Sequence, residues 1–451
     1  MKKILLVIYL TMLTGFSLSA QTHSQMDLPL QIINLDEARV LALANSRPLQ
    51  RFEMEIRRSI LDERNQLYTM LPQISAGYSA SMNFMRDWEF VNPVDTLSLG
   101  ADFSITQIIF QGGQTFIQRA INKISTESIR KNALAEYFDV LDAVDNAYYA
   151  VLESAATLEA EESSLQTAIL GLSIAEIRHA NGMINIGDYL RALAEKEMRE
   201  NSRNQARRNL TMNMNRFKAL TGITEAVELE PIDFNIYETV IMRLASISDE
   251  DADLLFAAFW NLLVSSNPTL ANAALSAQSA ELNLTNTRRD FSPTISATLF
   301  STDISFLPSY NATSRSGVAI RGSIPIDFWV LNDRIERSRI GRDIANLNFT
   351  NTEISLEQEL QNALFNLFSQ AGSVLSARRS LQYTERLFES VVERYRLGQS
   401  SVSDLTEATT LFINSRNSYT RASYGFLQNL SRLRSLCALG DKGQLLEILL
   451  Q

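Results

Sequence analysis

The sequence has little of what most enzymes and disulfide-stabilised proteins use. Its 451 residues include one cysteine, two histidines, nine prolines and 17 glycines. Lone Cys437 excludes an internal disulfide, and we expect it to be a small buried residue. No serine-nucleophile motif, glycine-rich phosphate loop or zinc-ligand cluster is present, so we expect neither cofactor nor enzymatic activity. The scarcity of proline and glycine instead indicates long uninterrupted helices.

Long apolar runs are also missing. Beyond residue 20 no window of 18 or more residues is predominantly apolar, which excludes a bundle of membrane-spanning helices. The apolar run at 4–16 follows Lys2 and Lys3, precedes small residues ending at Ala20, and is shorter than the ~20 residues of a spanning helix. Residues 1–20 are therefore predicted to be a secretory signal peptide, with an uncleaved anchor as the alternative. The mature chain would carry a net charge of about −12, which disfavours nucleic acid as a partner.

What the chain does have is an internal duplication at an offset of roughly 216 to 221 residues. NSRP at 45–48 matches SSNP at 265–268, LPQIS at 71–75 matches SPTIS at 292–296, and RHANG at 178–182 matches RYRLG at 394–398. We predict a first repeat at 34–222, a linker at 223–250, a second repeat at 251–440 and a tail at 441–451. Each repeat is expected to run helix, strand, strand, long helix, turn, helix.

The helical parts carry start signals and one clear periodicity. Asn34 with Glu37, and Ser248 with Asp251, are plausible helix caps. Residues 113–181 contain no proline, and apolar residues recur there every three or four positions, which predicts one buried stripe: Leu141, Val144, Tyr148, Leu152, Ala155, Leu158, Leu165, Ile169 and Leu172. A helix of about 68 residues would be ~100 Å long and must pack lengthwise against other helices. An ordinary coiled-coil rod is the alternative.

Four segments alternate apolar and polar residues, at about 72–86, 97–110, 292–306 and 316–326. Strands of ~9 to 11 residues with one apolar and one polar face are typical of a transmembrane barrel, although a soluble sandwich with one wet face shows the same alternation. Four strands cannot close a barrel, so copies must pool them. Two copies would give 8 strands and three would give 12; a wide interior favours three. A further short strand is predicted within 227–234.

The sequence QIIFQGG at 107–113, and RYRLG at 394–398 with DLTEATTL at 404–411, resemble the TolC-like outer-membrane efflux and secretion channels. The resemblance spans about 34–440, although PIDFW at 325–329 lacks the paired glycines of the first junction. It implies a homotrimer, with a 12-stranded barrel in outer-membrane lipid and a helical cylinder in the periplasm. It also implies a passive exit channel that docks a periplasmic adaptor (membrane fusion protein) and an inner-membrane RND or ABC pump. A soluble periplasmic coiled-coil adaptor or structural rod is the alternative.

The resemblance also implies roles for the turns at 182–187 and 398–403, which would form the periplasmic end. Asp404 and Glu407 would line a constriction, together with Asp188 and Tyr395. The arginine expected to bond there is Ser400 in this chain, which leaves Arg191, Arg394 and Arg396 as alternatives. Asp188 and Asp404 also suit helix starts, whatever the protein does. Residues expected to dock the adaptor are Gly182, Met183, Ile184, Asn185, Ile186, Gly187, Gly398, Gln399, Ser400 and Ser401. The three glycines are expected to adopt positive φ in the turns.

Overall fold

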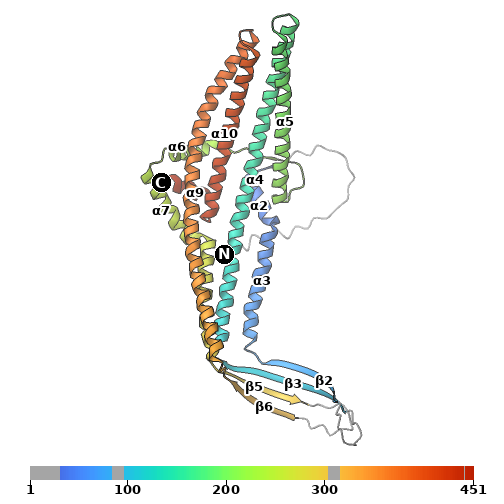
Figure 1. Cartoon of the computed structure of the whole chain (residues 1–451), viewed down its shortest axis with the longest axis vertical. Helices are drawn as coiled ribbons and strands as arrows, with labels where there is room; N and C mark the ends of the chain where they lie inside the picture. The colour runs from blue at the N-terminus through green and yellow to red at the C-terminus, as the bar shows by residue number, and fades with distance from the viewer. Residues whose placement is uncertain (1–30, 84–95, 303–314, 441, 451) are drawn as a thin grey trace.

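Two long helices set the shape of the molecule, and a sheet lies at one end of them (Figure 1). The computed structural model describes residues 31–83, 96–302, 315–440 and 442–450. Helix α4 (Gln114–Ala180) has 67 residues and α9 (Phe328–Arg396) has 69, so each is about 100 Å long at 1.5 Å per residue. Helices α5 (Ile186–Thr221) and α10 (Val402–Leu436) return from the far end to the middle. Helices α3 (Arg47–Tyr68) and α8 (Pro268–Arg288) lie beside the half nearer the sheet.

The duplication is visible in the order of the elements. The first repeat runs α2 (Leu35–Asn45), α3, two strands, α4 and α5, and the second runs α7 (Asp249–Ser266), α8, two strands, α9 and α10. Asn34 and Glu37 form a complete capping box, and Ser248 caps α7, as predicted. The matched motifs at 45–48 and 265–268 fall where one helix ends and the next begins.

Asn267 makes the second of these breaks. Its side-chain oxygen accepts from the amides of Thr269 (2.8 Å) and Leu270 (3.0 Å), and its amide nitrogen donates to the carbonyl of Leu436 at 2.8 Å. Among the described residues, no single helix is long and apolar enough to cross a membrane; α7 and α8 meet that measure only as a pair, across a bend of 51°.

The sheet is antiparallel and ordered β2 (Gln73–Asn83), β3 (Thr96–Gln111), β5 (Thr294–Thr302), β6 (Arg315–Ser323). The two repeats meet between β3 and β5, and β2 and β6 are left as edges. Strand β6 ends three residues before the predicted boundary at 326, because Pro325 has no amide to donate and disfavours pairing. The predicted loops at 86–96 and 307–315 and the signal peptide lie largely or wholly outside the described residues.

The strand register separates an apolar face from a polar one. Ile74 pairs with Ile105, which pairs with Leu299, which pairs with Val318. In the neighbouring rows, the hydroxyls of Ser75 and Ser104 are 2.7 Å apart and those of Thr106 and Thr298 are 3.2 Å apart. Successive residues of a strand point to opposite faces, so the predicted alternation is correct. Of the apolar row, Ile74, Leu299 and Val318 are exposed in the single chain.

The main hydrophobic core lies in the middle of the molecule, in what we call the belt: β1, α2, β4, α6, α7, α11 and the adjoining parts of α4, α9 and α10. Strand β1 (Gln31–Ile33) pairs in parallel with β4 (Val227–Leu229). The predicted strand at 227–234 is thus only three residues long, and Phe234–Tyr237 forms a short 3₁₀ helix. Buried Cys437 lies in this core as predicted, and burial raises the pKa of its thiol to about 12. Helices α6 (Glu238–Ala245) and α11 (Lys442–Leu450) complete it.

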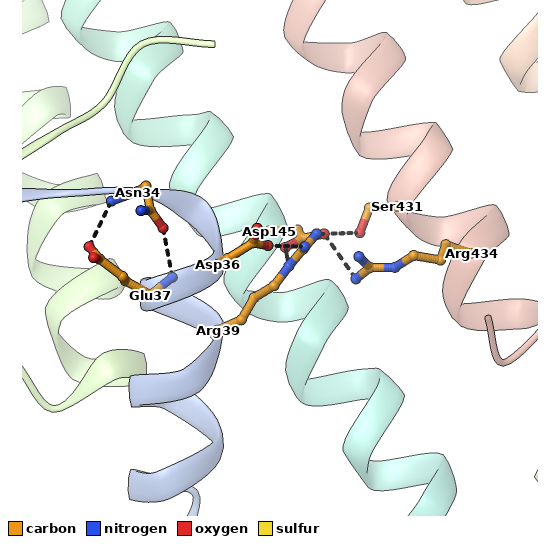
Figure 2. Close-up of polar contacts among 7 residues, drawn as sticks. All are labelled: Asn34, Asp36, Glu37, Arg39, Asp145, Ser431 and Arg434. Carbon is orange, nitrogen blue, oxygen red and sulfur yellow. Dashed lines mark hydrogen bonds and ion pairs between the residues drawn. The ribbon is translucent and has the colours of Figure 1, made fainter. Parts of the chain in front are cut away.

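A buried ion cluster joins three helices inside the belt (Figure 2). Asp145 of α4 is fully buried and accepts two hydrogen bonds of 2.6 Å from the guanidinium of Arg39 in α2. From α10, the Ser431 hydroxyl donates to it at 2.8 Å and Arg434 lies 3.0 Å away. Burial lowers the pKa of Arg434, whereas for Arg39 the bonds to Asp145 outweigh burial and raise the pKa. One carboxylate therefore holds two cations from different repeats.

The predicted apolar stripe of α4 is correct near the belt and wrong towards the far end. Leu141, Val144, Tyr148 and Leu152 are buried, but Ile169 is exposed, and the other members beyond Leu152 are only half-buried. The buried positions there are small: Ala160, Ser164, Ala168, Gly171 and Ala175. Small side chains let helices approach closely, so α5 and α10 pack on a different face of α4 from the one that hydrophobicity alone predicts.

Candidate functional site: the tip of the two helical hairpins

The turns 181–185 and 397–401, with the helix ends beside them, form what we call the tip, at the end opposite the sheet (Figure 1). Both turns end their long helix in the same way. The amide of Met183 donates to the carbonyl of Arg178, and that of Gln399 to the carbonyl of Arg394, both at 2.8 Å. This is the Schellman arrangement, which places a glycine in the left-handed region.

Positive φ was predicted for three glycines of the tip, and two of them adopt it. Gly182 has φ +71° and Gly398 has φ +80°, as expected for residues that end a helix in this way. Gly187 lies in the first turn of α5 and is not among the glycines with positive φ, so that prediction is wrong. The reason is that Asn185 in extended conformation caps α5, which places Gly187 inside the helix.

Asp404 is held at the start of α10 by a capping box. Its carboxylate accepts from the amide of Ser401 at 2.9 Å and from the hydroxyl of Ser400 at 3.0 Å, while the Ser401 hydroxyl accepts from the Asp404 amide at 3.1 Å. These hydrogen bonds, first that from the Ser401 backbone, lower the pKa of Asp404. The side chain is therefore an exposed, ionised carboxylate in a fixed position. Ser400, which replaces the expected arginine, is one of its partners.

Glu407 lies one turn further along α10 and is exposed. It makes no hydrogen bond or ion pair within the described ranges. Positions three apart share a helix face, so the two carboxylates lie on one side of α10. Asp188 occupies a related place at the start of α5, where its amide donates to the Asn185 side chain at 2.9 Å.

Tyr395 is almost fully buried, at 2% exposure, between the hairpins. Its hydroxyl donates to the main-chain carbonyl of Gly171 in α4 at 3.0 Å. Burial raises the pKa of the phenol, the charge of Arg178 opposes that rise and the charge of Asp188 adds to it. Tyr395 thus lies near Asp188, but its hydroxyl makes its hydrogen bond to α4.

The expected docking residues divide by exposure. Met183 and Ile186 are exposed, as are the turn residues Gly182, Asn185, Gly187, Gly398, Gln399 and Ser401. Ile184 is half-buried and packs on a small apolar cluster between the hairpins, and Ser400 is also half-buried. That cluster consists of Ala175, Ala192, Val391, Tyr395, Val402, Leu405 and Ala408. A cavity of ≈ 20 Å³ lies beside it, lined partly by Gly171 and Leu405.

In the described part of the chain, no group of three or more His, Cys, Asp or Glu side chains could hold a metal ion. Comparison with known proteins identifies the class of the protein. The model of the family described as "Outer membrane efflux protein" matches residues 38–223 and 260–439. The chain belongs to the outer membrane efflux protein family.

Relatives of this efflux family agree in sequence and fold. The outer membrane protein TolC of Escherichia coli K12 is 21% identical over 462 residues, which cover 96% of this chain and 86% of TolC. The outer membrane channel CmeC of Campylobacter jejuni superposes with a TM-score of 0.72 at 16% identity, covering 96% of this chain and 97% of CmeC. VceC of Vibrio cholerae superposes with a TM-score of 0.70 at 14% identity, covering 89% and 95%. As an outer-membrane efflux channel, the molecule extends from the outer membrane into the periplasm.

Sequence reasoning about this efflux channel missed the side chain that joins its two hairpins. Arg178 of α4 donates to the main-chain carbonyl of Tyr395 in α9, and its guanidinium carbon lies 4.8 Å from the centre of the Tyr395 ring. The duplication pairs Arg178 with Arg394 and so drew attention to the turn. It carried no information about which arginine faces the other hairpin.

Proposed function

We propose that three copies of this chain form a closed ring, which is the passive exit duct of a tripartite efflux or secretion system. The carrying observation is the four-stranded sheet, which has an exposed apolar face and two unpaired edges, β2 and β6. In lipid, unpaired backbone groups are too costly to leave exposed, so each β6 edge must meet the β2 edge of a neighbour. Such a head-to-tail contact generates a ring when the rotation closes.

The helices support the same assembly. On α9, Ile340, Ile344, Leu347 and Ile354 are exposed and follow steps of four, three and seven. On α3, Met54, Leu61 and Tyr68 are exposed at steps of seven. Heptad spacing is the pattern of a helix that meets a further helix along its length. In a ring, α3 of one copy and α9 of the next would cover these two stripes.

Cysteine cross-linking tests the number of copies. In a Cys437→Ala background, one cysteine on β2, in place of Ile74, is combined with a scan of single cysteines along β6. We expect oxidation of the correct pair in cell envelopes to give products that end at three chains. Products that end at two chains would favour an eight-stranded dimer. Extraction of the protein by high salt without detergent would favour the soluble rod.

We propose that the tip docks the periplasmic adaptor, because the apolar side chains of Met183 and Ile186 are exposed there beside the exposed backbone of the turn. The test is Met183→Glu, with Met212→Glu as the matched control. Met212 is exposed to a similar extent, 63% against 73%, but lies near the belt end of α5. The tip variant is expected to lose adaptor cross-linking and export in the native host while the control keeps both. Equal behaviour of the two variants would remove Met183 from the docking surface.

We propose that Asp404 and Glu407 form the constriction, since three copies would bring six exposed carboxylates together. Rings of carboxylates favour cations and repel anions. Planar-bilayer recordings of Glu407→Gln and of the Asp404→Asn/Glu407→Gln double variant are expected to lose cation selectivity stepwise. Glu197→Gln, an exposed carboxylate of α5, is the control. Unchanged selectivity in the double variant would exclude these residues from the constriction.

A further inference from the structure

The contact between Arg178 and Tyr395 joins the two hairpins at their ends. Arg178 lies in the last turn of α4 and Tyr395 in the last turn of α9. We propose that Arg178 is the tie that holds the two hairpins of one protomer together at the tip, and that its release accompanies opening. The inference rests on the proposed function for its link to opening, whereas the tie itself is a property of the single chain.

The chemistry of the contact makes it a cap supplied from outside the helix. The last carbonyls of a helix have no partner within it and carry the negative end of its dipole. In α9, the Tyr395 carbonyl accepts from the Gly398 amide at 3.1 Å and also from the Arg178 guanidinium. The same guanidinium lies over the Tyr395 ring, where a cation is favoured. Arg178 therefore recognises both the side chain and the helical end of α9.

A second hydrogen bond joins the Tyr395 side chain to the same helix, α4. The Tyr395 hydroxyl donates to the Gly171 carbonyl, two turns earlier on α4. Tyr395 is thus held from both sides by one helix. Gly398 belongs to the same arrangement, because a Cβ there would lie 3.4 Å from the Arg178 guanidinium. The last turn of α9 therefore gains stability from α4 in addition to its own terminal hydrogen bonds.

The other contacts close to the tip are apolar. The cluster between the hairpins contains alanines and valines together with Tyr395 and Leu405, and Leu172, Ile174 and Ile184 pack against it. Other arginine bridges between the hairpins lie further from the tip: Arg199 of α5 donates to the Thr410 hydroxyl at 2.6 Å, and Arg416 of α10 donates to the Glu159 carboxylate of α4 at 2.9 Å. Arg396 and Glu393 form a 2.9 Å ion pair within α9 that does not cross to α4. Loss of Arg178 should therefore separate the hairpin ends without unfolding either hairpin.

Spin labels at positions 183 and 399 test the tie directly. The full-length protein is purified in detergent in a Cys437→Ala background, and labelled chains are diluted with unlabelled ones so that one pair is measured per assembly. Wild type is expected to give one short distance. Arg178→Ala is expected to raise the ratio of separated to closed tips about tenfold, since a hydrogen bond to a charged group is lost. Arg178→Lys, which keeps the charge but not the planar fork, should lie between.

Arg396→Ala is the matched control, because it removes an arginine from the same turn of α9 without touching α4. Its distance distribution should equal that of wild type. An Arg178→Ala distribution equal to wild type would overturn the proposal; if that variant does not fold, an unchanged distribution in Arg178→Lys has the same consequence. In bilayers, Arg178→Ala should be open more of the time. If Arg178→Ala widens the tips but no variant conducts ions in bilayers, the proposed exit duct is rejected, whereas the tie between the hairpins is retained.

Discussion

The long helices α4, α9 and α10 run through both the belt and the tip, but the two regions hold them in different ways. In the belt, large side chains are fully buried, and Asp145 binds arginines from both repeats. At the tip, most buried side chains other than Tyr395 and Leu405 are small, and Arg178 and Tyr395 supply polar contacts between the hairpins. The difference indicates that the belt fixes the helices at mid-length. The tip should therefore move at a smaller free-energy cost than the belt, which suits the proposed opening at that end.

Removal of the belt carboxylate should have the largest effect. Asp145→Asn leaves two buried guanidinium groups without their counter-charge, and loss of one partner of a buried pair destabilises by about 3–5 kcal/mol. Thermal unfolding in detergent measures the loss. Asp36→Asn is the control, because Asp36 also binds Arg39 but is 88% exposed, and exposed pairs contribute about 1 kcal/mol or less. Similar unfolding temperatures for the two variants would contradict the role given to the belt.

One chemical change can be made in both regions. The Tyr148 hydroxyl in the belt donates to the carbonyls of Glu230 at 2.7 Å and Ile33 at 3.1 Å. Tyr148→Phe removes this donor from the Glu230 carbonyl, while the Ile33 carbonyl keeps the Glu230 amide at 3.0 Å, and should reduce the free energy of unfolding by about 1–3 kcal/mol. Tyr395→Phe removes one bond at the tip, worth about 0.5–1.5 kcal/mol.

Hydrogen exchange separates the regional effects of this pair. Tyr395→Phe should raise exchange in the last turns of α4 and α9 without lowering protection in the belt. Tyr148→Phe should lower protection of β1 and β4. A belt-wide response to Tyr395→Phe would contradict the separation of the two regions.

Two glycines, one in the turn after α9 and one within α9, separate the tip from the rest of the hairpin. Gly398→Ala forces a side chain into the left-handed region and should destabilise the turn by about 1–2 kcal/mol. Gly372→Ala is the opposite case, since Gly372 is helical and a Cβ there would meet no atom within 4 Å. That variant should be stabilised by up to about 1 kcal/mol. Limited proteolysis at the tip should increase in the first variant only.

Acidification should stabilise the belt and weaken the tip, and this is the smallest of the expected effects. Burial raises the pKa of Asp142 in the belt, so the native state keeps this proton to higher pH than the unfolded chain. Acidification from neutral pH towards about 4, the ordinary value of an aspartate, should therefore stabilise the belt. The pKa of Asp404 is lowered, so its capping contribution is present above about 4 and is lost below it.

The unfolding temperature, measured from pH 7 to pH 3, checks both directions. Asp142→Asn should flatten the rise between pH 7 and pH 4. Asp404→Asn, which can still cap, should remove the loosening of the tip below pH 4 in hydrogen exchange. A wild-type unfolding temperature that falls steadily from pH 7 would argue against the assignment to Asp142.

The fold could be predicted from the sequence because its main signals are local. The period-two segments, the absence of proline between residues 113 and 181 and the Asn34–Glu37 box depend on neighbouring residues. The errors arose where a distant element decides the outcome. Ile169 fits an apolar stripe, but α5 and α10 pack against the small residues of α4 instead. Arg178 reaches a main-chain carbonyl, and such an acceptor leaves no mark in the composition of the sequence.

The short parallel pair of β1 and β4 has a consequence for how the chain folds. Residues 31–33 pair with residues 227–229, so this pairing can form only after the whole first repeat has been exported. Contacts of such long sequence separation are slow to form, because the chain must lose the entropy of a large loop before they compensate for it. Until then β1 lacks its partner strand. Assembly of the belt is therefore expected to be a late step, and the exported chain needs protection from aggregation before it.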